Sequence, residues 1–207
     1  MSTPPVVEFV WYKASDEAKL TPTLGKEALD IVSSTPGAQK VFRGYQAEDD
    51  GITYVSVAWD SIKAHQDLMQ DKARYDPVGA SLGPTVAPGA QLSMVHAAFN
   101  NHEAAVQAIE DPATELAFLT LKSADKASIL RSSLDNLEKA LATSPGRRSY
   151  TWGKVVEKED QYLLIIGWDS VEAHWDALKV DQNLSAAVAK MRESVDIDLV
   201  HVHYKGF

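Results

Sequence analysis

The sequence predicts an α+β protein made of two tandem ferredoxin-like (split βαβ) units that form one intramolecular α+β barrel. The first reason is a repeat: Trp59–His65 (Trp-Asp-Ser-Ile-Lys-Ala-His) returns 109 residues later as Trp168–His174 (Trp-Asp-Ser-Val-Glu-Ala-His). The second is that both halves show the order strand-helix-strand-strand-helix-strand. The third is that an antiparallel sheet with helices on a single face leaves its other face bare, and a second copy can cover it.

The two copies align along most of their length. An offset of 109 residues holds without a gap from residue 8 to residue 69 of the first copy, and it pairs Phe9 with Phe118. Near the last strand the offset falls to 107, which pairs His96 with His203. We therefore read the chain as a tandem duplication in which the second copy has lost two residues before its last strand.

The expected domain boundaries follow from this alignment. We expect a first ferredoxin-like unit over residues 1–99, a linker over 100–113 and a second unit over 114–207. A short helix over Ala104–Ile109 is expected within the linker because it is rich in alanine and has apolar residues at helical spacing.

The individual elements follow from hydrophobic spacing and from turn residues. Strands are expected where β-branched and aromatic residues cluster, and helices where apolar residues recur every three or four positions. In the first copy the expected order is strand Val6–Lys13, helix Asp16–Ser34, strands Gln39–Gln46 and Thr53–Trp59, a helix from Ser61 through Met69, a loop over Pro77–Pro88 and strand Gln91–Phe99. In the second copy it is strand Glu115–Lys122, helix Asp125–Thr143, strands Arg147–Val156 and Gln161–Trp168, helices Ser170–Lys179 and Leu184–Ser194, and strand Ile197–Tyr204.

Composition excludes several classes of function. The chain has 207 residues, is 45% hydrophobic and carries a formal net charge of −9, so a nucleic-acid or anionic-membrane partner is not expected. It contains no cysteine, which excludes disulfides, thiolate metal sites and cysteine nucleophiles. We find neither a signal-peptide pattern nor an apolar run that could span a bilayer. A cytoplasmic location is therefore expected, and the sequence leaves a homodimer open.

Two residues of the repeated motif have side chains that could take part in chemistry. Trp59 and Trp168 share strand parity with apolar neighbours, so we expect both to be buried core residues under the helices. His65 and His174 could act as bases or metal ligands. Because the histidine recurs in both copies, a structural hydrogen bond that ties helix to sheet is the preferred interpretation.

The strand that ends in aromatic-Asp-Ser-x-x-Ala-His, followed by a helix, resembles the dimeric α+β barrel superfamily. This superfamily includes antibiotic-biosynthesis-type monooxygenases, stress-responsive barrel proteins and polyketide cyclases. The resemblance covers Val6–Phe99 and Glu115–Phe207. It implies that two units pair into a barrel with helices outside and a ligand pocket within, so that one chain here builds what elsewhere needs a dimer.

The resemblance does not supply catalytic residues. The histidine of haem-degrading members aligns near Val78 and Ala187, and neither side chain binds iron. The tyrosine and histidine of the polyketide cyclase align near positions where neither residue type occurs, namely Leu68, Arg74, Ala177 and Asn183. The catalytic residues therefore stay unknown, and no cofactor is expected.

The expected ligand-binding residues face the space inside the barrel. In the last strand the valines point one way and His201 and His203 the other, so the histidines face the lumen if the valines face the helices. Two histidines at this spacing can chelate a metal, but we find no obvious carboxylate partner and expect no metal. The complete expected set is Tyr54, Ser56, His96, His201 and His203, and it forms one asymmetric cavity because a fused barrel lets each copy diverge.

Two functions remain open from the sequence. The first is a small-molecule-binding or stress-associated barrel protein without recognisable catalytic residues, whose partner is a small apolar or aromatic molecule. The alternative is a cofactor-independent monooxygenase or cyclase that acts on an aromatic or quinone-like secondary metabolite. A buried histidine or tyrosine with a perturbed pKa in a large cavity favours the alternative.

Overall fold

The computed structural model describes residues 4–207, and it divides into two compact units. The first unit comprises the residues up to Ala98 together with Tyr204–Phe207, and the second unit comprises Phe99–His203. The stretch expected as a linker forms helix α5 (His102–Glu110) and belongs to the second unit. The last residues of the chain group with the first unit, where the backbone N–H of Phe207 donates to the carbonyl of Val41 (3.0 Å).

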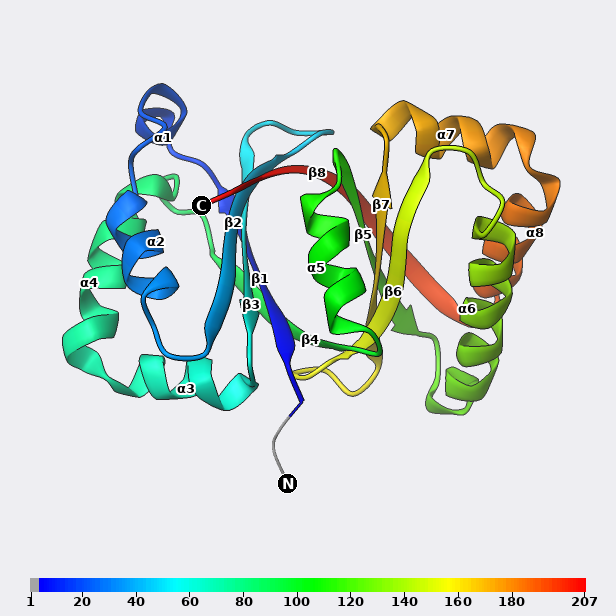
Figure 1. Ribbon diagram of the computed structural model, residues 1–207, viewed down its shortest axis with the longest axis horizontal. Helices are drawn as coiled ribbons and strands as arrows, with labels where there is room; N and C mark the ends of the chain where they lie inside the picture. The colour runs from blue at the N-terminus through cyan, green and yellow to red at the C-terminus, as the bar shows by residue number, and fades with distance from the viewer. Residues whose placement is uncertain (1–3) are drawn as a thin grey trace. The chain divides into compact units, whose positions relative to one another are not determined.

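The first unit is an antiparallel sheet with helices on one face (Figure 1). Its strands pair in the order β2-β3-β1-β4, which is the ferredoxin-like order. The strands are β1 (Val6–Lys13), β2 (Ala38–Gln46), β3 (Ile52–Trp59) and β4 (Ser93–Phe99). The helical segments are α1 (Asp16–Leu20), α2 (Lys26–Ser33), α3 (Ile62–Gln70), α4 (Lys72–Leu82) and the 3-10 turn η1 (Gly83–Thr85).

The second unit repeats this topology with strand order β6-β7-β5-β8. Its strands are β5 (Ala113–Leu121), β6 (Arg147–Val155), β7 (Gln161–Trp168) and β8 (Val195–Gly206). After α5, its helical segments are the 3-10 turn η2 (Ala124–Lys126), α6 (Ala127–Leu141), α7 (Val171–Val180) and α8 (Gln182–Met191). Each unit is thus a ferredoxin-like antiparallel sheet with helices, which confirms the predicted α+β class with two tandem ferredoxin-like units.

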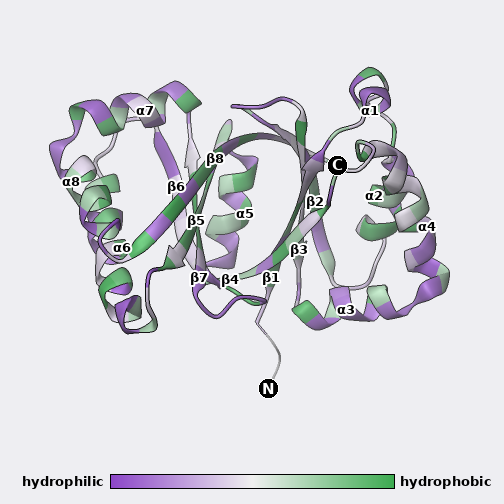
Figure 2. Ribbon diagram, turned by 180° about the vertical axis from the view of Figure 1, so that it is seen from behind, coloured by the Kyte–Doolittle hydropathy of each residue, from purple (hydrophilic) through white to green (hydrophobic). Residues whose placement is uncertain are grey.

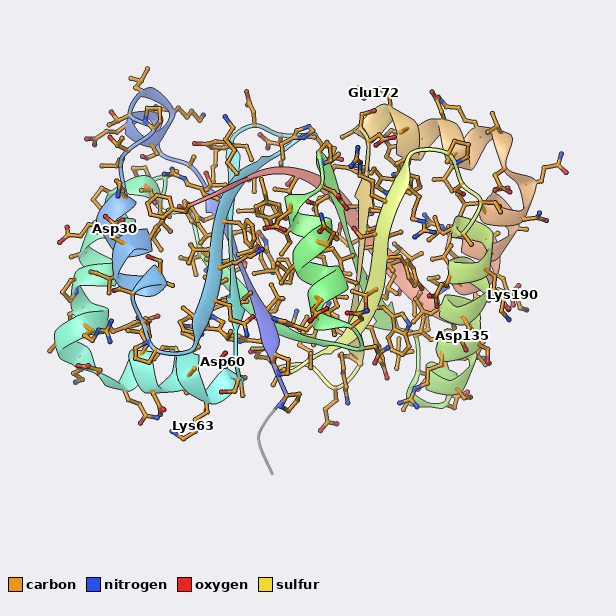
Figure 3. All side chains as sticks on the ribbon, viewed as in Figure 1. Asp30, Asp60, Lys63, Asp135, Glu172 and Lys190 are labelled. Carbon is orange, nitrogen blue, oxygen red and sulfur yellow. The ribbon has the colours of Figure 1, made fainter. Side chains whose placement is uncertain are left out.

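The core of each unit lies between the sheet and its helices. In the second unit, one face of α6 buries four leucines against the sheet, and the helix has a hydrophilic opposite face (Figure 2). Charged side chains such as Lys63 on α3, Glu172 on α7 and Lys190 on α8 point outward into solvent (Figure 3). This separation of apolar and charged faces explains why the helices pack on the sheet through one side only.

Four residues of the repeated motif, the tryptophan, serine, alanine and histidine, have structural roles that recur in both units. Ser61 and Ser170 are N-caps, since their hydroxyls accept hydrogen bonds from the backbone N–H of Ala64 and Ala173, respectively. The motif histidines and tryptophans make buried hydrogen bonds in both units. The two tryptophans are fully buried, as the sequence predicts.

The motif alanine packs against the glycine of the recurring Pro-Gly pair. Gly37 and Gly146 have φ angles of 89° and 76°, a left-handed conformation that favours glycine. A Cβ atom on Gly37 would lie 2.5 Å from the Ala64 Cβ, and one on Gly146 would lie 2.8 Å from the Ala173 Cβ. The strand-to-helix connection is therefore held by a close contact that requires a small residue on both sides.

The structure corrects the alignment of the copies. Val6 pairs with Trp59, and Ala113 pairs with Trp168, so β1 and β5 correspond at an offset of 107 residues and not 109. The match of Phe9 with Phe118 was therefore coincidental. The segment between the first strand and the Pro-Gly pair is therefore two residues longer in the second unit, where α6 stands in place of α1 and α2.

Two element predictions were also wrong. The helix expected over Asp16–Ser34 is two helices, because Pro22 and the left-handed Gly25 interrupt it. The first half of the loop expected over Pro77–Pro88 belongs to helix α4, with Pro77 inside it, and the 3-10 turn η1 follows. Val78, the residue after this proline, is buried.

Candidate functional site

The helix-facing side of the first unit holds a buried cluster of four polar side chains. This first-unit cluster consists of Glu8 on β1, Trp59 at the end of β3, His65 on α3 and His96 on β4. The indole Nε1 of Trp59 donates a hydrogen bond to Glu8 Oε2 (2.8 Å), and a second hydrogen bond joins His65 Nδ1 and His96 Nε2 (2.7 Å). His65 Nδ1 lies 3.5 Å from Glu8 Oε2, and its ring stacks on Trp59 with centroids 5.0 Å apart.

The second unit carries the same cluster. This second-unit cluster consists of Glu115 on β5, Trp168 on β7, His174 on α7 and His201 on β8. Trp168 Nε1 donates to Glu115 Oε2 (2.8 Å), and a hydrogen bond joins His174 Nδ1 and His201 Nε2 (2.8 Å). His174 Nε2 lies 3.6 Å from Glu115 Oε2, and its ring stacks on Trp168 at 5.0 Å.

The strand registers bring these residues together in both units. Glu8 is opposite His96, and Glu115 is opposite His201, across the antiparallel pairs β1–β4 and β5–β8. His96 therefore corresponds to His201 and not to His203, which corrects the alignment expected from the sequence. The motif turn then places the helix histidine over the tryptophan, so that three strands and one helix supply one cluster.

Burial dominates the electrostatics of the second-unit cluster. Glu115, His174 and His201 expose 4%, 4% and 0% of their surface, respectively. Burial raises the pKa of Glu115 to about 7, although the hydrogen bond from Trp168 acts in the opposite direction. Groups with a shift of this kind are common at functional sites, and they also occur in structural networks.

The second-unit cluster opens onto a cavity of about 370 Å³. Glu115, Trp168 and His174 form part of its wall, and Arg192 and Asp198 are exposed charged residues on the same wall. The rest of the wall is apolar and comes from the sheet and from α6, α7 and α8: Ala117, Leu119, Leu137, Leu141, Leu164, Ile166, Trp175, Leu178, Leu184, Val188, Met191, Ile197 and Leu199.

The equivalent space in the first unit is much smaller. The cavity beside Glu8 and His65 has a volume of about 80 Å³. Val10 lines it where the second unit has the smaller Ala117, since the two residues correspond through the strand registers. Tyr75 of α4 lines it as well, and burial followed by the nearby Glu8 raises the pKa of this phenol. Larger side chains therefore occupy, in the first unit, part of the space that is an open cavity in the second unit.

The expected ligand-binding residues lie at several places. Tyr54 and Ser56 are buried on the face of the first sheet away from the helices, where Tyr54 stacks on Trp11 and Ser56 shares a hydrogen bond with the hydroxyl of Tyr204 (2.8 Å). His96 lies on the opposite, helix-facing side of that sheet. The residues Tyr54 and Ser56 therefore do not share a pocket wall with His96.

The two histidines of the last strand also differ from the expectation. His201 faces the helices, where it bonds His174, so the assumption that the valines of β8 face the helices was wrong. His203 is exposed, and its Nδ1 lies 3.0 Å from the carbonyl oxygen of Pro112. The second-unit cavity is lined by none of the five expected residues.

Sequence reasoning missed the two glutamates. The search for a carboxylate partner of His201 found none, yet Glu115 lies across the strand pair. Each cluster also brings a carboxylate and two imidazoles together, with one donor atom of each within 4.8 Å of the others: Glu8, His65 and His96, and Glu115, His174 and His201. A comparison of the copies at the correct offsets would have revealed a glutamate, a tryptophan and two histidines repeated in both.

Comparison with solved structures supports the fold. A Fusobacterium nucleatum protein provisionally assigned as a monooxygenase is similar with a TM-score of 0.70 at 10% identity, over 100% of this chain and 95% of that chain. A Lactobacillus acidophilus protein with the same provisional assignment gives 0.64 at 11% identity, over 97% and 94% of the two chains. An anthrone oxidase-like protein gives 0.69 at 15% identity, over 99% and 94%.

These likenesses support the predicted α+β fold. No protein-family model matches the sequence. No curated protein matches it significantly either. Among residues 4–207, no helix combines the length and apolar character needed to cross a membrane.

Proposed function

We propose that this protein binds one small, mainly apolar organic molecule in the cavity of the second unit. The observation that carries the proposal is the cavity of about 370 Å³ beside Glu115 and His174. Small-molecule sites are typically concave, about 300–1,000 Å³ in volume and mostly apolar, with a few polar groups that orient the ligand. The second-unit cavity has each of these properties.

The lining residues define the class of ligand. Aliphatic side chains from sheet and helices surround most of the cavity, which suits a flat ring system or a branched hydrocarbon. Glu115 and His174 offer hydrogen-bonding atoms at one part of the wall, which suits a hydroxyl or carbonyl group on the ligand. A small aromatic molecule with one polar substituent fits both requirements.

Native mass spectrometry of protein purified from its own source tests this proposal. We expect a retained small molecule on the wild-type protein and its loss from the variant Ala117→Phe, whose ring fills the cavity. The matched control Val10→Leu changes the corresponding strand position of the first unit and should keep the molecule. Circular dichroism confirms that both variants are folded. Loss of the molecule from Val10→Leu alone would contradict the assignment to the second unit.

A second candidate is a cofactor-independent oxygenase. The observation that favours it is the carboxylate–imidazole pair Glu115–His174 on the cavity wall. Such a pair can take a proton from an acidic C–H group or a phenolic O–H group of a bound molecule. The suitable probe is anthrone, since one solved structure with this fold is described as anthrone oxidase-like. The reaction would convert anthrone and O₂ into anthraquinone and water.

Oxygen consumption with anthrone separates the two candidates. An oxygenase should form anthraquinone faster than buffer alone, and Glu115→Gln should remove this acceleration. Binding of anthrone without product formation would leave the binding function and reject this reaction. The glutamine is nearly isosteric with Glu115 and can still accept the hydrogen bond of Trp168, which limits the structural effect of the substitution.

A further inference from the structure

The second-unit cluster has the composition and position of a metal site. We propose that Glu115, His174 and His201 bind one divalent transition-metal ion, with an open coordination position that faces the second-unit cavity. Two imidazoles and one carboxylate form a ligand set that suits Zn²⁺, Fe²⁺ and Co²⁺. The proposal is independent of the organic ligand proposed above, because the metal can be measured alone.

The three side chains converge from separate elements. β5 supplies the carboxylate, α7 and β8 supply the imidazoles, and the donor atoms lie within 4.8 Å of one another. All three residues are buried, which shields the site from competing water. Ligands held by two paired strands and a packed helix are positioned by the fold itself, as a stable metal site requires.

A metal ion would replace the hydrogen bond between the two imidazoles. His174 Nδ1 and His201 Nε2 lie 2.8 Å apart. Two nitrogens bound to Zn²⁺ at about 2.0–2.1 Å in a tetrahedral site stand roughly 3.3 Å apart, so the pair must open by about 0.5 Å. Rotation of the two side chains can supply that opening without movement of the strands.

Trp168 provides the outer contact that metal-binding carboxylates commonly have. Its indole N–H donates to Glu115 Oε2, which fixes the orientation of the carboxylate. A carboxylate has two oxygens with about four lone-pair sites, so it can accept this hydrogen bond and still bind a metal. Trp168 is fully buried and cannot exchange this hydrogen bond for one to water.

The difference in cavity volume between the two units is the reason to assign the proposed metal site to the second unit. Three protein ligands leave a fourth position for water or substrate in a tetrahedral site. Glu115 and His174 line a cavity of about 370 Å³, which has room for that ligand, whereas the cavity beside Glu8 and His65 has only about 80 Å³. The first-unit cluster is therefore expected to keep its hydrogen bonds and to bind no exchangeable metal.

Titration with Co²⁺ and Zn²⁺ tests the proposal on the full chain. After dialysis against a chelator, the wild-type protein should bind one equivalent of Zn²⁺ in calorimetry and give visible Co²⁺ absorption. The variants Glu115→Gln and His201→Asn should weaken this binding by at least about 10-fold, the smallest effect usual even for outer-contact changes. Their matched counterparts Glu8→Gln and His96→Asn should keep it.

Two results would overturn the proposal. One is a wild-type protein that binds neither metal with a dissociation constant below about 100 μM, which corresponds to roughly −5.5 kcal/mol. The other is full binding retained by both second-unit variants. Circular dichroism of each variant establishes that it is folded, and Glu115→Gln is informative even if His201→Asn fails to fold. Failure here would leave the organic-ligand proposal intact, since that proposal rests on the cavity alone.

Discussion

The two units have the same scaffold and the same buried cluster, but they differ in the space beside it. In both clusters the tryptophan donates a hydrogen bond to the glutamate, and a second hydrogen bond joins the two histidines, with lengths of 2.7–2.8 Å. The neighbouring cavities measure about 80 Å³ in the first unit and about 370 Å³ in the second. The four residue types of the cluster and its two hydrogen bonds therefore recur, whereas the ring nitrogen of the helix histidine that faces the glutamate and the size of the neighbouring cavity differ.

This comparison separates two roles that one residue set could have. In each unit one hydrogen bond of the cluster ties the helix of the motif histidine to the last strand, and the other ties the motif tryptophan to the first strand, which indicates a structural role. The second-unit cluster borders a cavity of about 370 Å³, whereas the first-unit cluster borders one of about 80 Å³, and this is why the proposed function is assigned to the second unit. In a fused chain each copy can change alone, whereas a symmetric dimer carries every change twice.

The largest expected effect tests whether the cluster supports both units equally. We expect Trp59→Ala and Trp168→Ala each to lower the free energy of unfolding by about 3–5 kcal/mol, because both indoles are fully buried. Urea denaturation followed by circular dichroism measures the change. Losses below about 1 kcal/mol for both variants would show that the cluster is not a structural device.

A second test concerns the Pro-Gly connection that both units share. We expect Gly37→Ala and Gly146→Ala to cost about 1–3 kcal/mol each, from the left-handed backbone and from the close approach of a new Cβ to Ala64 or Ala173. Gly89→Ala is the matched control, since Gly89 has a φ of 77° but no atom near its added Cβ. Thermal melts should rank Gly89→Ala as the mildest of the three. An equal loss of stability for all three variants would show that the contact with the motif alanine does not contribute to stability.

The smallest effect concerns the helix caps. We expect Ser61→Ala and Ser170→Ala to lower stability by about 1 kcal/mol each, because the N-cap hydroxyl accepts a backbone N–H at the start of α3 and α7. The exposed Ser185 inside α8 is the control, and its replacement by alanine should not destabilise the protein. Denaturant titration measures both losses. A large difference between them would show that the β3–α3 and β7–α7 connections do not contribute equally to stability.

Sequence reasoning predicted the fold well because the repeat and the strand patterns are local signals. The strands of both copies, the buried tryptophans and the helix-to-sheet hydrogen bond of each motif histidine were all predictable. The α4 helix was missed because Pro77 and nearby glycines suggest a loop, although the helix predicted near residues 184–194 in the second copy pointed to its counterpart.

The cluster itself was harder to predict. Glu8 and Glu115 meet their histidines only through strand register, and a single gap-free offset misaligned both strands. Alternate residues of a strand face opposite sides of the sheet. Because Val202 was assumed to face the helices, His201 was predicted to face away from them, whereas it contacts His174 on the helix side. Cavity size depends on packing of distant side chains such as Tyr75, which no local pattern encodes.

Titration with 1-anilinonaphthalene-8-sulfonate tests most directly whether the cavity beside the second-unit cluster binds a small molecule and the cavity beside the first-unit cluster does not. Fluorescence and calorimetry should give one molecule bound per wild-type chain and a strong reduction for Ala117→Phe. The variant Tyr75→Ala removes a wall residue of the first-unit cavity and should add a second binding site. Two equivalent sites in the wild-type protein, or binding unaffected by Ala117→Phe, would contradict the account.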